Sequence, residues 1–80
     1  MVTRAFYVKY LERTLASVSR DEARYRDSDE PGFVKLADHL VKVAQQTQNE
    51  LDRVLEEPDG GDYGSDLAEF NEHVLYPKGA

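Results

Sequence analysis

Apolar residues recur with helical spacing over the first third of the chain. Four of them are separated by three, four and three positions, which places them on one stripe of a helix. Thr3, just before this pattern, has the hydroxyl group favoured at a helix N-cap. The pattern predicts a first helix over about residues 3–26. The stripe consists of Val8, Leu11, Leu15 and Val18.

A second helical pattern is longer and covers about residues 29–57. Its apolar positions alternate in steps of four and three, the heptad spacing of a helix packed along a partner helix. Ser28 or Asp29 is suited to cap it, and Pro31 is suited to its first turn. We expect this helix to return antiparallel along the first. The seam consists of Phe33, Ala37, Leu40, Ala44, Thr47, Leu51 and Val54.

Pro58 and three glycines interrupt the second pattern, which predicts an acidic Gly/Pro connector over residues 58–65. Ser65 is a suitable N-cap for a short third helix over about residues 66–76. Residues 77–80 are expected to be a loose tail. The apolar positions of the third helix are Leu67, Phe70 and Val74.

The third helix follows the end of the second, which lies beside the start of the first in an antiparallel hairpin. Ten helical residues span only about 15 Å, so it cannot reach the turn of the hairpin. The sequence therefore predicts an all-α fold in a single domain over 1–80, an antiparallel two-helix hairpin closed at one end by a short third helix. The third helix is expected to pack against Phe6, Tyr10, Leu51 and Leu55.

A second stripe on the long helix is only partly covered in this arrangement, because the third helix is expected to reach Leu55 and at most Gln48. The stripe is formed by Val34, Val41, Gln48 and Leu55, about 100° from the centre of the seam. Val34 and Val41 lie beyond the expected reach of the third helix. They are candidates for self-association in a homodimer or for contact with another protein, and the alternative is that they are ordinary exposed valines.

Charge is distributed unevenly along a chain of net charge -6. Residues 1–26 carry six bases and three acids, whereas residues 27–80 carry four bases and thirteen acids. No base occurs between Arg53 and Lys78. This segment predicts a partner-binding acidic surface that is attracted to basic protein patches, unless the acids serve only solubility. The acidic surface comprises Glu56, Glu57, Asp59, Asp62, Tyr63, Asp66, Glu69 and Glu72.

Four bases of the first helix form the opposite kind of surface. A helical repeat places them within about 60° of one another, opposite the apolar stripe. Such a line of cations could follow phosphates, although the net charge of -6 and the lack of a helix-turn-helix pattern make nucleic acid an unlikely partner. This basic ridge consists of Lys9, Arg13, Arg20 and Arg24.

Catalytic and cofactor-binding patterns are missing. There is no cysteine, no serine in a Gly-x-Ser-x-Gly turn and no Gly-rich phosphate loop, and His39 and His73 lie far apart in sequence. A calcium-binding loop fails in both registers, counted from Glu57 or from Asp59, because position 5 is then Gly61 or Tyr63. We expect neither an enzyme nor a bound cofactor or metal.

These observations favour a non-catalytic protein–protein interaction module in the cytoplasm, since no apolar run approaches the roughly 20 residues of a membrane span and no signal peptide is recognisable. Phages and mobile elements use small acidic chains of this class as inhibitors or regulators of host proteins. The expected target is a basic surface of a host protein, including a nucleic-acid-binding one. The alternatives are a nucleic-acid accessory protein using the basic ridge and a purely structural dimer or assembly component.

Overall fold

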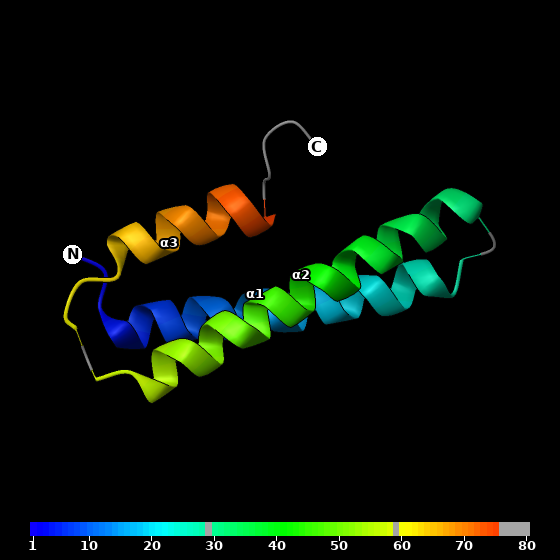
Figure 1. The fold of residues 1–80 in the computed structure, drawn as a ribbon. Coiled ribbons are helices and arrows are strands. Elements are labelled where there is room, and N and C mark those ends of the chain that lie inside the picture. The colour runs from blue at the N-terminus through cyan, green and yellow to red at the C-terminus, as the bar shows by residue number, and fades with distance from the viewer. Residues whose placement is uncertain (29, 59, 76–80) are drawn as a thin grey trace.

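The structure, a computed structural model, describes residues 1–28, 30–58 and 60–75 (Figure 1). The described residues form helices joined by two short connections, with no strand among them. The all-α hairpin predicted from the sequence is confirmed. The helices in chain order are α1 (Arg4–Arg26), α2 (Pro31–Glu56), α3 (Gly64–Phe70) and η1 (Asn71–Leu75), a π-helical segment that continues α3.

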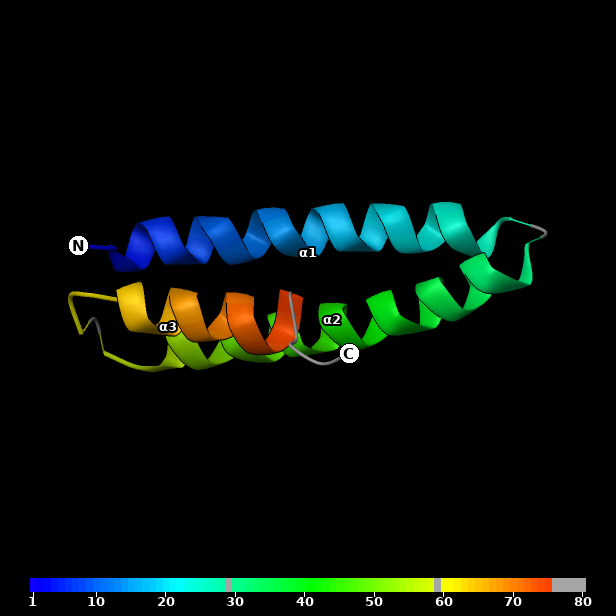
Figure 2. The ribbon, with the colours of Figure 1, turned by 90° about the horizontal axis from the view of Figure 1, so that it is seen from above.

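The long helices α1 and α2 lie side by side and antiparallel along their whole length (Figure 2). At one end, which we call the turn end, the rings of Tyr25 and Phe33 pack with their centres 5.4 Å apart. At the other end, which we call the closed end, the connector after α2 leads into α3 (Figure 1). The molecule is elongated, with dimensions of 45 × 25 × 17 Å.

The helices differ in how their first residues are capped. The Thr3 hydroxyl accepts a hydrogen bond from the Phe6 amide at 3.1 Å, as the sequence predicts for an N-cap. Ser28 accepts instead from the Glu30 amide, at 3.2 Å, and α2 starts at Pro31 without a side-chain cap. The start of the third helix was predicted too late, because α3 begins at Gly64.

The closed end holds the main hydrophobic core. In it α3 lies on one side of the hairpin, and its Phe70 ring meets the Tyr10 ring edge-on at 6.3 Å. The predicted packing of α3 on Phe6 and Leu55 is wrong, because these side chains are 58% and 54% exposed. α3 instead approaches the flank of α1 that carries Tyr10. The buried residues of this core are Tyr7, Leu11, Leu51, Val54, Tyr63 and Phe70.

The predicted seam of α2 is buried over most of its length but not at its start. Phe33 is 42% exposed, although the heptad pattern includes it. Val43 is buried outside the predicted seam, and the Thr47 hydroxyl is satisfied by donating to the Val43 carbonyl at 2.7 Å. The buried residues of α2 are Ala37, Val43, Thr47, Leu51 and Val54.

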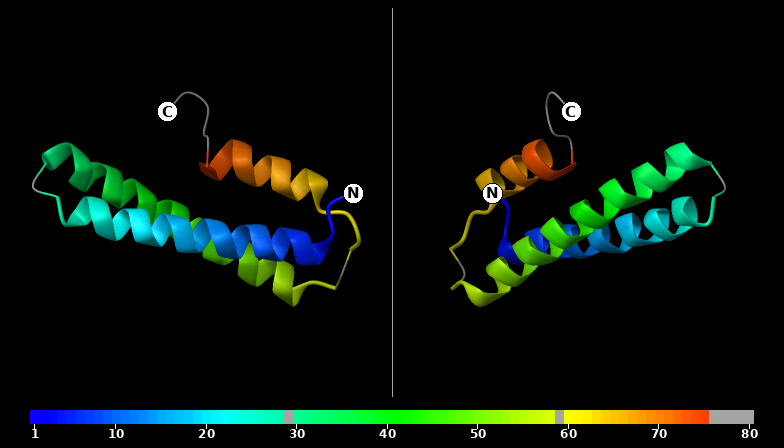
Figure 3. Two further views of the ribbon diagram at one scale, coloured as in Figure 1. Left: turned by 180° about the vertical axis from the view of Figure 1, so that it is seen from behind. Right: turned by 45° about the vertical axis from the view of Figure 1, so that its right-hand side comes forward.

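Among the described residues, only α1 and α2 reach the turn end of the hairpin. α3 and η1 together contain 12 residues, which span about 18 Å, whereas the 26 residues of α2 span about 39 Å. Figure 3 shows the third helical segment ending near the middle of the hairpin. Three apolar side chains near the start of α2 are exposed at this end, namely Phe33, Val34 and Leu36.

Candidate interaction surfaces

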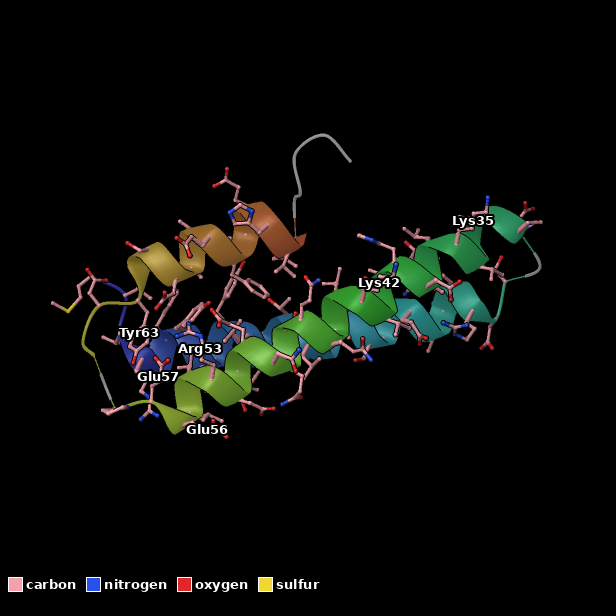
Figure 4. All side chains as sticks on the ribbon, viewed as in Figure 1. Lys35, Lys42, Arg53, Glu56, Glu57 and Tyr63 are labelled. Carbon is pink, nitrogen blue, oxygen red and sulfur yellow. The ribbon has the colours of Figure 1, made fainter. Side chains whose placement is uncertain are left out.

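Tyr63 lies in the core rather than on the acidic surface. Its side chain is 4% exposed, and its ring stacks on Tyr7 with 5.8 Å between centres. Its amide donates to the Val2 carbonyl at 2.8 Å, and its hydroxyl accepts from the Gly60 amide at 3.1 Å. The prediction that Tyr63 contributes to partner binding is therefore wrong, because the connector folds its ring inward against α1 (Figure 4).

Asp62 orders the connector. One of its carboxylate oxygens, Oδ1, accepts from the amides of Gly64 at 2.9 Å and Val2 at 3.1 Å. These two N–H groups lower the pKa of the Asp62 carboxyl. Gly61, with φ of 94°, supplies the left-handed residue that the turn requires. Asp62 thus ties the chain's start to the start of α3, a structural role that its charge alone did not reveal.

Arg53 neutralises part of the acidic surface. Its guanidinium pairs with Glu50 at 2.6 Å and with Glu57 at 3.0 Å, and it lies 3.8 Å from an Asp66 carboxylate oxygen. Arg53 extends from α2 towards α3 (Figure 4). Sequence reasoning treated Arg53 as the border of a base-free segment. In the fold it sits within that segment's surface, so Glu57 and Asp66 are partly engaged.

Glu50 connects Arg53 to the buried Tyr7. The Tyr7 hydroxyl donates to Glu50 Oε2 at 2.6 Å and lies 3.2 Å from the carbonyl oxygen of Asp66. Burial and the neighbouring Glu50 carboxylate raise the Tyr7 pKa, while the hydrogen bond from Arg53 lowers the Glu50 pKa. The three helices are thereby joined by one polar network next to the core. The sequence pattern gave no signal for this network.

Arg4 closes the C-terminus of α2. Its guanidinium donates to the carbonyl oxygens of Val54 at 2.8 Å, Leu55 at 2.8 Å and Glu57 at 3.0 Å. These carbonyls have no partner within the helix, and a cation there also complements the negative end of the helix dipole. Arg4 is therefore a structural residue.

The remaining carboxylates of the acidic surface do not form one continuous patch. Glu56 and Glu69 are exposed and form no ion pair with another described residue, and Glu72 is exposed on η1. Glu56 points away from the side of the hairpin that carries α3 (Figure 4). Asp59 lies outside the described residues. The fold leaves carboxylates on two sides of the closed end.

The basic ridge remains free. All four of its side chains are exposed, and none forms an ion pair with a described residue. This distinguishes them from Arg4, Arg26 and Arg53, each of which is engaged within the molecule. Lys9 and Arg13 also border a shallow hollow beside the rings of Phe6 and Tyr10.

The second stripe lies along an open groove. Val34 is 40% exposed, and Val41 is half-buried in a hollow of about 260 Å³ between α1 and α2. The expectation that the third helix leaves Val34 and Val41 uncovered agrees with these positions, although their role in self-association is untested. The residues lining this open groove are Ser19, Glu22, Val41, Ala44, Gln45 and Gln48.

A further hollow of about 390 Å³ lies between α2 and the third helical segment. Two of its charged groups, Glu50 and Arg53, already bind each other. Within residues 1–28, 30–58 and 60–75, no group of three or more histidine, cysteine or acidic side chains is placed to hold a metal ion. None of the described helices is long and apolar enough to cross a membrane.

The chain matches no protein-family model, no curated protein and no solved structure.

Proposed function

We propose that the chain is a non-catalytic protein-binding module that docks on a basic surface of another protein through carboxylates at its closed end. The observation that carries this proposal is that Glu56 and Glu69 are exposed on the best-packed part of the molecule and form no ion pair with another described residue. A net charge of -6 adds long-range attraction to a basic partner. The proposal includes a role as a small inhibitor or regulator, of the type that phages and mobile elements encode, acting in the cytoplasm.

The rigid support of these carboxylates favours binding over mere solubility. Arg4, Asp62 and the Tyr7–Glu50–Arg53 network order the closed end before any partner arrives. A preordered surface loses little conformational entropy on docking, and exposed charges mainly accelerate encounter and select the partner. A surface that normally holds phosphates is the natural target, because its cations are already arranged for anionic groups.

The test uses charge reversal at the two free carboxylates. Glu56→Lys/Glu69→Lys should abolish capture of the proteins that the parent chain retains from a host lysate. Asp27→Lys/Glu30→Lys, which makes the same charge change at the turn end, should capture them normally. Asp62 is left intact because its substitution would disturb the connector. Equal capture by both variants and the parent would contradict the proposal.

A second candidate is a nucleic-acid accessory protein, and the unpaired state of the basic ridge favours it. From Lys9 to Arg24 the ridge extends about 22 Å along α1. A mobility shift at about 50 mM salt, where phosphate contacts are strongest, tests it. Binding that Arg13→Glu/Arg20→Glu removes and Lys35→Glu/Lys42→Glu retains would support this candidate, and absence of binding by the parent would eliminate it.

A purely structural dimer or assembly component is the third candidate, and the 40% exposure of Val34 favours it. Sedimentation velocity of the parent and of Val34→Asp, at matched concentrations, decides it. A monomeric parent would remove this candidate.

A further inference from the structure

The hairpin has two lateral grooves between α1 and α2, and the described residues occupy only one of them. α3 lies along one groove at the closed end, on the flank of α2 that carries Glu50 and Arg53 (Figures 1 and 3). At about 100° per residue, Val41 and Gln48 lie on roughly the opposite flank of α2. They line the open groove, to which no residue of α3 or η1 contributes.

The floor of the open groove is apolar and uncharged. Val41 and Ala44 are half-buried there, and Gln45 and Gln48 are exposed at its border. The second stripe prolongs this floor towards both ends, through Val34 and Leu55, which are exposed apolar side chains. From Val34 to Leu55 the floor is about 32 Å long, close to the length of a 20-residue helix.

The edges of the open groove are acidic. Glu22 lines the α1 edge. At about 100° per residue, Glu12 falls on the same edge of α1, and Asp38, Asp52 and Glu56 fall towards the α2 edge. Arg26 offsets part of this charge, through ion pairs with Glu22 at 2.8 Å and Asp38 at 3.3 Å near the turn end.

Apart from Arg26, the lysines and arginines close to this groove in sequence project from other faces of the helices. In Figure 4 Lys35 and Lys42 project from the upper side of α2, on which α3 also lies. Glu56 projects from the lower side. The basic ridge lies on the outer flank of α1, away from Val8 and Leu15. An apolar floor between two acidic edges is therefore left for a partner of opposite charge.

We propose that the open groove binds an amphipathic helix of a partner protein, with an apolar stripe on the groove floor and lysine or arginine along both flanks. This inference deepens the proposed function, on which it rests, by naming the kind of partner element. The molecule already contains the corresponding contact on its other side, where α3 packs Phe70 against the hairpin. A partner helix would cover the second stripe and satisfy the acidic edges together.

Charge decides between this occupant and two others. A second copy in the same groove would bring acidic edges against acidic edges, which opposes association. A nucleic acid would meet the same carboxylates with its phosphates. An amphipathic basic helix would place its apolar stripe on the apolar groove floor and its lysine or arginine side chains against the carboxylates of the edges.

The experiment uses a labelled synthetic peptide of about 20 residues, with leucine at heptad positions and lysine on the flanks, in fluorescence anisotropy at about 50 mM salt. Glu12→Lys/Gln48→Lys changes the α1 edge and the groove border, and should weaken binding by about tenfold or more. Gln46→Lys/Asp27→Lys is the matched control, with the same charge change at two exposed positions outside the groove lining, and should bind like the parent. All four positions are exposed, so circular dichroism should show unchanged helicity.

The outcomes separate the two proposals. Loss of binding in the groove variant alone, with no binding of a peptide whose lysines are replaced by glutamate, supports the groove. Loss in Glu56→Lys/Glu69→Lys without loss in the groove variant would overturn the groove while leaving the acidic closed end as the docking site. Failure of the peptide to bind the parent, equal loss in both variants, or a parent dimer dispersed by Gln48→Lys would each overturn it.

Discussion

The two ends of the hairpin use the same two helices but differ in how much they bury. At the closed end a third helix covers one groove, and Tyr7, Leu11 and Val54 are completely buried. At the turn end α1 and α2 are the only helices among the described residues, and Phe33, Val34 and Leu36 are partly exposed. A helix with a broad apolar arc needs more than one neighbour, and here only half of α2 has two. We therefore expect stability to be concentrated at the closed end and unsatisfied apolar surface at the turn end.

The largest difference between the ends should appear on aromatic truncation. Tyr7→Ala removes a fully buried ring and its hydroxyl, and should lower the free energy of unfolding by about 3–5 kcal/mol. Phe33→Ala, at the turn end, should cost at most about 1.5 kcal/mol because its ring is already partly in water. Urea denaturation followed by circular dichroism measures both. Similar losses would show that the two ends contribute equally.

A smaller effect is expected at the polar network of the closed end. Glu50→Gln removes a carboxylate that binds both Arg53 and Tyr7, and should lower the free energy of unfolding by about 1–3 kcal/mol at neutral pH. Because the folded state lowers the Glu50 pKa, this contribution is present above the unfolded pKa of about 4.3 and is lost as pH falls through the folded value. When the pH is lowered from about 7 to about 3, the free energy of unfolding should therefore fall less in the variant than in the parent, which thermal melts at each pH would show. Parallel curves would contradict this.

The Tyr7 hydroxyl should matter less at neutral pH and more in alkali. Tyr7→Phe keeps the ring and should cost about 0.5–1.5 kcal/mol. Since folding raises the Tyr7 pKa, its contribution is complete below the unfolded pKa of about 10 and is lost as pH rises above it. Raising the pH above that value should lower the melting temperature of the parent more than that of the variant, which thermal melts would measure. An identical alkaline response would exclude Tyr7 as its source.

The smallest effect is expected at the turn end. Arg26 makes two ion pairs there, with Glu22 and Asp38, but its own side chain is 47% exposed and that of Asp38 is 65% exposed. Exposed ion pairs contribute little after solvent screening and the loss of side-chain entropy. Arg26→Gln should leave the denaturation midpoint unchanged within error. A shift comparable to that of Glu50→Gln would break the contrast between the two ends.

The helices could be predicted from the sequence because their signals are local and periodic. Thr3, Pro31 and the heptad seam predicted starts and partners that the fold confirms. Prediction failed for Tyr63, which was placed on the surface because its neighbours in sequence are acidic and glycine residues. Its burial depends on a contact with Tyr7, more than fifty positions away, which no local pattern encodes.

The sequence by itself determined that the chain forms two long helices and a short one, because helical periodicity and capping act over a few residues. It also determined the unequal distribution of charge. Only the tertiary structure decided which charges are free, since Arg4 and Arg53 find their partners across the hairpin. It likewise decided which groove α3 occupies and which it leaves open, because that choice depends on packing between helices distant in sequence.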